Sequence, residues 1–291
     1  MGMRGWWQDL TDLVLPAECG GCGRPRTVLC PDCRVALCGA APRPVRPVPE
    51  LRGLPVVHAA APYADEVRAV LLAHKERGAL PLARPLGVAL AGAVRAGLSG
   101  VLDGPVLLVP VPSGRRAVRA RGHDPARRIA LAAAAELRRT GTPARVLAVL
   151  RQRRPVADQA GLDARQRLEN VAGALSVAAG GAGLLRAGPV VLVDDLMTTG
   201  ASLAEAARAV RAVPAEGTAG YSGAASGTRG DVVTAVYAGA NGERRGERMT
   251  GSMEESTGPE RVVPGKANHA PDLICAAVIA APPDSFEINR S

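Results

Sequence analysis

The sequence predicts an α/β protein, with a parallel β-sheet flanked by helices and preceded by a small zinc ribbon. Short apolar runs bounded by Gly and Pro alternate with longer segments of helical periodicity, the order typical of parallel sheets. Four cysteines lie in two C-x2-C pairs within the first 40 residues. One apolar run, 190–193, passes through two acids and a small-residue loop into a helix. These three observations carry the prediction.

Length and composition limit the number of domains, the kind of core and the class of ligand. A length of 291 residues suggests roughly two units, and 47% hydrophobic residues suffice for a core. Because only 2% of residues are aromatic, the core must consist of Ala, Val and Leu. The net charge of +9 suits an anionic ligand, either a polyphosphate or a nucleic acid. An arginine- and alanine-rich composition can also reflect genomic base bias, so the charge carries little weight by itself.

The N-terminus predicts a cytoplasmic protein. Residues 1–12 lack a continuous apolar segment followed by a small-residue cleavage site, and no apolar run reaches the length of a membrane span. Cysteines in a reducing compartment serve as metal ligands more often than as disulfides.

The spacing of the cysteines favours a metal-binding site. Cys19, Cys22, Cys30 and Cys33 form C-x2-C-x7-C-x2-C, which predicts a structural four-cysteine Zn²⁺ site in a ribbon domain, residues 1–40. A redox C-x-x-C pair is the alternative. Five prolines in residues 41–55 indicate an extended linker to the main domain.

Apolar periodicity and stop signals define the elements before the central motif. Asp124 is expected to cap one helix, and Gly78 and Gly141 to end helices. The expected strands are 56–62, 106–114 (running into a turn) and 144–150, and the expected helices are 65–77, 82–98 and 124–139.

The central motif begins at a buried strand, 190–193, followed by Asp194 and Asp195. The small residues 198–202 then lead into a helix. Loop amides, hydroxyl groups and a helix N-terminus together favour a phosphate group. Carboxylates beside a phosphate would repel it unless they accept hydrogen bonds from hydroxyl groups of the same ligand, so the motif predicts a sugar phosphate. The alternative is that the aspartates cap the helix and the glycine only turns the chain.

The motif Val-Leu-Val-Asp-Asp-Leu-Met-Thr-Thr-Gly-Ala-Ser, residues 191–202, closely resembles the signature of type I phosphoribosyltransferases for phosphoribosyl pyrophosphate (PRPP). The cysteine ribbon, the segment 110–124 and the segment 151–170 are similar to the ComF family, a branch of that fold. The resemblance covers most of residues 10–213 and the strand near 274–281. It implies a type I phosphoribosyltransferase fold that binds PRPP with Mg²⁺.

The resemblance also implies roles for individual residues. Asp194 and Asp195 would bind the ribose and metal, and Lys75 would reach a phosphate, although a solvated helix end is an equal alternative. The 5′-phosphate loop would be Met197, Thr198, Thr199, Gly200, Ala201 and Ser202. The pyrophosphate loop would be Ser113, Gly114, Arg115, Arg119 and Arg121. A flexible loop closing over the ligand would carry Arg151, Gln159, Arg167 and Asn170. A solvated basic loop and a structural helix hairpin are the respective alternatives for these last two segments.

Residues 214–273 interrupt the pattern. They are rich in Gly, Ser, Thr, Glu and Arg without sustained periodicity, which predicts a disordered insertion; only 231–238 is strand-like. The apolar run 274–281 then supplies the last strand. The phosphoribosyltransferase-like domain is therefore expected to span 56–213 and 274–291.

Two functions follow from the sequence. The first is transfer of the phosphoribosyl group of PRPP with release of pyrophosphate, to an acceptor that no motif identifies. The second is a non-catalytic accessory protein of competence and DNA uptake, which binds single-stranded DNA or competence proteins, or senses a ribose phosphate. Scarce aromatic residues argue against base stacking but allow contacts to phosphates.

Overall fold

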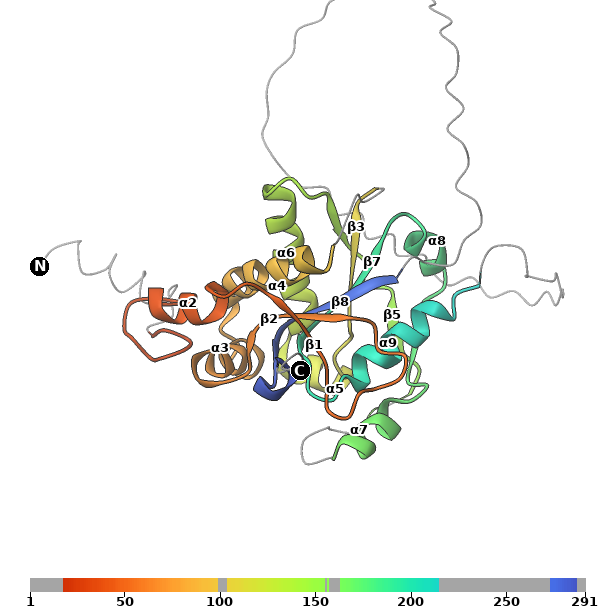
Figure 1. Cartoon of the computed structure of the whole chain (residues 1–291), viewed down its shortest axis with the longest axis horizontal. Coiled ribbons are helices and arrows are strands. Elements are labelled where there is room, and N and C mark those ends of the chain that lie inside the picture. The colour runs from red at the N-terminus through yellow and green to blue at the C-terminus, as the bar shows by residue number, and fades with distance from the viewer. Residues whose placement is uncertain (1–17, 99–103, 155, 157–162, 215–272, 287–291) are drawn as a thin grey trace, which may run out of the picture. The chain divides into compact units, whose positions relative to one another are not determined.

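The main sheet has six strands, five of them parallel (Figure 1). The computed structural model describes residues 18–98, 104–154, 156, 163–214 and 273–286. The strand order is β1-β2-β8-β7-β3-β4, and only β1 runs antiparallel, to β2. The strands are β1 (Arg43–Val45), β2 (Val57–Pro62), β3 (Val106–Pro110), β4 (Ala144–Val146), β7 (Val190–Leu196) and β8 (Leu273–Ala281). The α/β prediction with a mostly parallel sheet is confirmed.

Helices cover both faces of the sheet, which explains why its strands are apolar throughout. Successive residues of β3 point to opposite faces: Leu108 packs with α4 (Ala83–Gly97) and α6 (Pro125–Arg139), whereas Leu107 packs with α9 (Ala201–Arg211). Figure 1 shows α4 and α6 on one side of the sheet and α9 on the other. The core consists almost entirely of Ala, Val and Leu, as the composition predicts.

Small residues let α4 and α6 approach closely. A Cβ atom at Gly87 of α4 would lie 2.5 Å from the Cβ of Ala132 and 2.8 Å from backbone atoms of α6. No side chain fits at that distance, because the obstructing atoms include backbone. Gly87 therefore sets the spacing of the helix layer behind β3 and β7.

Most of the predicted helices are confirmed, with boundaries shifted by one or two residues. The first, α3 (Asp65–Glu76), is followed by a 3-10 turn, η1 (Leu80–Leu82). Asp124 caps α6 as predicted, since its Oδ1 accepts a hydrogen bond of 3.2 Å from the amide of Arg127. The remaining short helices are α2 (Pro31–Cys38), α8 (Gly181–Leu185) and η2 (Pro283–Phe286).

The segment after β3 differs from the prediction. Residues expected to form a basic loop fold as a short helix, α5 (Arg115–Arg121). Arginine and alanine are strong helix formers, and Gly122, at φ +73°, ends the helix in the left-handed conformation. In this helix Arg121 lines one cavity and Arg119 another, which divides the predicted pyrophosphate loop.

The expected strand 144–150 is also divided. Only β4 joins the main sheet, whereas β5 (Leu150–Gln152) pairs antiparallel with β6 (Leu175–Val177) in a separate two-stranded sheet. Between them, α7 (Ala164–Val171) begins with a capping box in which Asp163 and Gln166 each accept a backbone hydrogen bond from the other. We call β5, β6 and α7 the hood.

The N-terminal segments are integrated into the main body. Residues 43–45 of the predicted linker form β1, and α2 contacts α3, α4 and β2. A Cβ at Gly20 would lie 2.6 Å from Leu82 of η1. Cys30, Cys33 and Leu37 are buried in the same core as α4 and β8. Ribbon and sheet thus share one core.

The predicted insertion lies almost wholly outside the described residues, as 215–272 do. Across the described ranges, no helix has the length and apolar character needed to cross a membrane.

Candidate functional site

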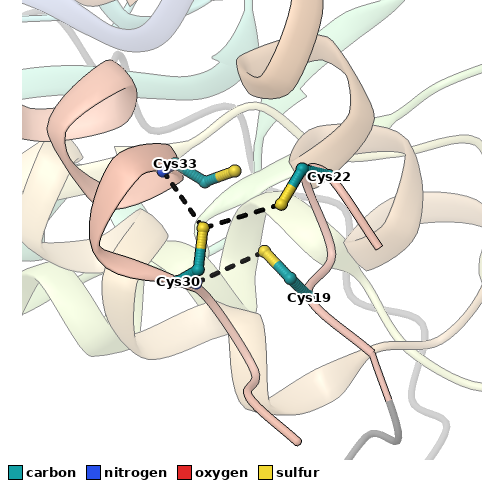
Figure 2. A group of neighbouring side chains, drawn as sticks. All are labelled: Cys19, Cys22, Cys30 and Cys33. Atoms are coloured by element: carbon teal, nitrogen blue, oxygen red, sulfur yellow. Dashed lines mark hydrogen bonds between the residues drawn. The ribbon is translucent and has the colours of Figure 1, made fainter. Parts of the chain in front are cut away.

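Four cysteine sulfurs converge at the N-terminal segment (Figure 2). Cys19 and Cys22 lie on a loop, Cys30 is the N-cap of α2, and Cys33 lies in its first turn. All four Sγ atoms are within 4.8 Å of one another, and none is in a disulfide. Four thiolates bound tetrahedrally at about 2.3 Å from zinc would be separated by about 3.8 Å. The predicted ligands are therefore brought together in an arrangement that could hold a zinc ion.

Backbone amides support thiolate character in this cluster. The amide of Cys30 donates to Cys19 Sγ over 3.3 Å, and the amide of Cys33 donates to Cys30 Sγ over 3.5 Å. Burial opposes ionisation of Cys19, but amide donors at Cys30, Cys22 and Gly21 outweigh it and lower its pKa to about 6. Burial beside the other thiols raises the pKa of Cys33. A cation among the four sulfurs would resolve this opposition.

The second candidate site is a cavity of about 1100 Å³ at the carboxyl ends of the parallel strands. Strands β3 and β7 are neighbours in the sheet. The chain continues from β3 to β4, on one side of this pair, and from β7 to β8, on the other side. In open α/β sheets, ligands bind where connections diverge in this way. Residues 111–114, which follow β3, and residues 194–203, which comprise the end of β7 and the segment after it, both line the cavity.

The two motif acids line this cavity at the end of β7. Asp195 is buried, and its Oδ2 lies 2.8 Å from the ammonium of Lys75, near the end of α3. Asp194 Oδ1 accepts a hydrogen bond of 2.8 Å from the amide of Asp195. Burial raises the pKa of Asp194 well above its ordinary value, and the charge of Asp195 adds to that effect. Two carboxyl groups therefore lie close together, one paired with the Lys75 ammonium, and the raised pKa of Asp194 favours its protonated form while no cation is bound there.

The Lys75 ammonium remains charged. Burial alone would lower its pKa, but the nearby carboxylate of Asp195 outweighs burial, and the pKa is raised. The sequence placed Lys75 either on a phosphate or in solvent. The structure shows its ammonium paired to a motif acid 120 positions away, at the lining of the cavity, and its contact with a phosphate stays a prediction.

The loop between β7 and α9 has the geometry expected of a strand–loop–helix turn. Gly200 precedes the helix at φ +75°, and residues 197–203 line the cavity. The first backbone amides of a helix have no partner within the helix, so this end can donate to an anion. Thr199 Oγ1 accepts a hydrogen bond from the amide of Ala201 at 3.4 Å. Met197 is buried, and its amide donates to Ala280 in β8, so that amide is already engaged.

The segment after β3 divides the predicted pyrophosphate loop between two cavities. Ser113, Gly114 and Arg121 line the main cavity, whereas Arg119 and Arg151 line an adjoining one of about 290 Å³. Both cavities share Pro112, Ser113 and Gln152 as lining residues. Arg115 opens α5.

Arg121 is held by a residue that sequence reasoning did not single out. Its guanidinium donates to both carboxylate oxygens of Glu76, at 3.1 and 2.8 Å. Glu76 and Lys75 are adjacent on α3, so the end of this helix binds both α5 and β7. The sequence His-Lys-Glu-Arg at 74–77 drew attention to Lys75, but nothing local indicated a partner for Glu76.

The hood and the two residues that follow its strand β5 contribute basic side chains to the cavity. Arg153, Arg154 and Arg167 line it, whereas Asn170 lies in α7 outside the lining residues. The remaining flexible-loop candidate, Gln159, lies outside the described residues. Because the motif acids line the same cavity, it brings basic and acidic side chains together.

A buried acid of α9 holds the hood to the body. Glu205 is 6% exposed, and its Oε1 accepts a hydrogen bond of 2.9 Å from the amide of Leu175 in β6. Arg208 donates to the carbonyl of Leu175 at 2.9 Å and to both oxygens of Glu205 at 2.7 Å. Leu175 itself lines the cavity. The helix that begins at the small-residue loop thus also positions the hood.

The sequence analysis also did not predict the apolar residues that line the 1100 Å³ cavity. Tyr63, Leu71 and Leu72 lie on or before α3, and Val171 lies at the end of α7. Their sequence signal is that of ordinary helix packing, and only the three-dimensional arrangement shows them at the cavity. The two histidines at these segment ends, His74 and His123, make an edge-on ring contact at 5.7 Å and do not line it.

Comparison of the chain with models of protein families gives no match, and comparison with curated proteins gives none either.

Proposed function

We propose that the chain is a phosphoribosyltransferase-like protein of the ComF family, with the type I phosphoribosyltransferase fold. It would bind PRPP with Mg²⁺ and transfer the phosphoribosyl group with release of pyrophosphate. One observation carries the proposal. The acids and small-residue loop of the PRPP-like motif line a 1100 Å³ cavity at the strand ends where the connections diverge, together with arginine-bearing segments.

The lining residues fit the parts of a sugar diphosphate. The loop at 198–202 and the start of α9 would bind the 5′-phosphate. Asp194 and Asp195 would accept hydrogen bonds from the ribose hydroxyls. The lining arginines would bind pyrophosphate: Arg121, Arg153, Arg154 and Arg167. This division gives the two anionic ends of the ligand separate sets of hydrogen-bond donors.

The carboxylates of Asp194 and Asp195 also fit the metal. Mg²⁺ prefers oxygen ligands and is commonly held by one or two carboxylates together with substrate phosphates. When bound, it would offset the charge that develops on the leaving pyrophosphate.

The transfer step would break the bond between ribose C1 and the pyrophosphate oxygen, whose electron pair leaves with pyrophosphate. A bond from C1 to the acceptor forms, and the acceptor releases a proton. The carbon acquires oxocarbenium character, so the protein's task is to hold geometry and charge. Arginines that stay in place would stabilise the departing anion, and a hood covering the cavity would exclude the water that otherwise hydrolyses PRPP.

Calorimetric titration with PRPP, with and without Mg²⁺, tests this proposal. Binding is expected to require Mg²⁺ and to be lost in Asp194→Asn/Asp195→Asn. Glu136→Gln is the matched control, because it removes a carboxylate that pairs with Arg139 on α6 away from the cavity lining. Absence of PRPP binding to the unaltered protein would reject the proposal, whereas binding would justify a screen of acceptors by pyrophosphate release.

A specific observation supports the second candidate function. Arg119 and Arg151 are exposed and line the smaller cavity outside the main one, where they could contact a phosphodiester backbone. Binding of single-stranded DNA that weakens steeply with salt and is reduced in Arg119→Ala/Arg151→Ala would favour this function. Such binding with no affinity for PRPP would make it the sole candidate.

A further inference from the structure

The first observation is a selective use of lysine. Of the 36 basic residues in the chain, only Lys75 and Lys266 are lysines. Lys75 is the one in the described residues, and it lies in the cavity rather than on an open surface. Its side chain is 34% exposed and its partner carboxyl, Asp195, is 9% exposed.

The second observation is that the Lys75 ammonium contacts one of the two motif carboxyl groups. The ammonium lies 2.8 Å from Asp195 Oδ2. Asp195 is one of the two acids that the proposed ligand and its metal would need. An ammonium is a compact charge with three donors on a flexible stem, whereas a guanidinium forms a planar fork. Lysine can therefore neutralise one carboxylate oxygen and turn to another partner without leaving the cavity.

The third observation is that the helix beneath Lys75 is anchored independently. The neighbouring Glu76 accepts two hydrogen bonds from Arg121, which fixes the end of α3 relative to α5. The ion pair between Lys75 and Asp195 is thus not the only tie between this helix end and the cavity, and it can open while the helix stays in place.

From these observations we infer that Lys75 is an exchangeable counter-ion of Asp195. In the free protein it neutralises the acid and competes with metal ions. A ligand that carries both anionic phosphates and a metal ion separates the pair, and the ammonium then binds a phosphate oxygen. The inference rests on the proposed function, because it assumes a sugar phosphate with a divalent cation at this site.

The consequence is selectivity for the complete ligand. A metal ion that binds alone must displace Lys75 from Asp195, and the displaced ammonium then has no anionic partner. A phosphate-bearing ligand that binds with the metal supplies that partner, so both Asp195 and Lys75 are paired. Metal and phosphate ligand are therefore expected to bind with positive coupling, each strengthening the other.

Substitution of Lys75 tests the inference through two effects of opposite sign. In Lys75→Met, Mn²⁺ alone, followed by its paramagnetic resonance signal, is expected to bind about tenfold more tightly, because no internal cation competes. PRPP with Mg²⁺, followed by calorimetry, is expected to bind about tenfold more weakly, because a charge-assisted hydrogen bond is lost.

The matched control is Arg77→Met, which removes the same charge two positions along the chain from a residue that does not line the cavity. It is expected to alter neither titration. Lys75→Gln keeps a hydrogen-bond donor without the charge and serves if Lys75→Met does not fold, as judged by circular dichroism. It should give both effects with the same signs.

The outcomes separate this inference from the proposed function. Weakening of both ligands, or no change in Mn²⁺ affinity, would overturn the counter-ion role even if the unaltered protein binds PRPP. Tighter Mn²⁺ binding in Lys75→Met, with no PRPP binding to any variant, would support the counter-ion role and reject the proposed ligand.

Discussion

The cysteine cluster and the strand-end cavity both bring ionisable side chains together, but over very different spans of the chain. The cluster takes all four side chains from residues 19–33 and brings their sulfurs within 4.8 Å. The cavity takes its lining from five separate segments between Tyr63 and Leu203. Its key ion pair joins Lys75 and Asp195, 120 positions apart.

Because of this difference, the two sites depend on different interactions. The cluster is held by its own amide-to-sulfur hydrogen bonds and, once loaded, by the metal. The cavity depends on the sheet to align β3 with β7 and on long-range polar contacts to place α3, α5 and the hood. The two regions nevertheless share one core, so loss of the first should reach the second.

The largest expected effect is loss of the metal. Cys30 is fully buried, caps α2 and offers one of the four sulfurs, so Cys30→Ser should abolish zinc binding. Structural zinc sites contribute on the order of 10 kcal/mol to the folding of small metal-binding peptides. We expect residues 18–38 to unfold and the Tm of the whole protein to fall, measured by elemental analysis and calorimetric melting.

Cys38→Ser is the control, because Cys38 lies outside the cluster. It should keep its zinc and lose little stability. Loss of zinc from Cys30→Ser with an unchanged Tm would show that the two regions are independent, against the shared core.

The next effect concerns the hood. In Glu205→Gln the buried acceptor for Leu175 loses its charge and its pairing with Arg208. Loss of one such charge-assisted contact costs about 1–3 kcal/mol. Urea unfolding should show a decrease of that order, and zinc content should stay constant because the cluster is local. A change in zinc content would contradict the separation of the two sites.

The same contact predicts a pH dependence. Burial raises the pKa of Glu205, but hydrogen bonds from Arg208, Leu175 and Gly173 outweigh burial and lower it. A carboxyl whose pKa is lowered on folding contributes stability above its unfolded pKa of about 4.3, and loses it as the pH falls through the folded value. The difference in unfolding free energy between the natural protein and Glu205→Gln should therefore shrink below about pH 4. A constant difference down to pH 3 would reject this origin.

The same contrast explains which parts of the fold and of the two sites could be predicted from the sequence. The cysteines are predictable because their ligand spacing is local, and β7 with its loop is predictable because strand, acids and small residues are consecutive. The partners of Lys75, Glu76 and Glu205 are not, since each is fixed by a register between distant elements. The arginines after β3 were expected in one loop, yet α5 turns Arg119 and Arg121 toward different cavities.

A smaller effect is expected at the small-residue loop. Gly200 has φ +75°, and a Cβ there would lie 2.9 Å from a methyl group of Leu54. Gly200→Ala should cost about 1–2 kcal/mol through the left-handed conformation, measured by urea unfolding. Gly183→Ala, where the added Cβ meets nothing within 4 Å and φ is not positive, should be neutral or slightly stabilising. Equal effects of the two substitutions would mean that the loop can relax.

The smallest effect on stability is expected where the cavity meets solvent. The Glu76 and Arg121 side chains are 47% and 22% exposed, and exposed ion pairs typically contribute about 0.2–1 kcal/mol. Glu76→Gln should therefore change unfolding by urea only slightly. Its effect on PRPP binding should be larger, because the two hydrogen bonds that aim Arg121 are weakened while Arg121 itself remains. The exposed pair of Arg165 and Glu169 on α7 supplies the control, Glu169→Gln, which removes a similar ion pair from residues that do not line the cavity. If both variants bind PRPP equally well, Glu76 stabilises the end of α3 without positioning Arg121, and the cavity depends less on its long-range contacts than its construction implies.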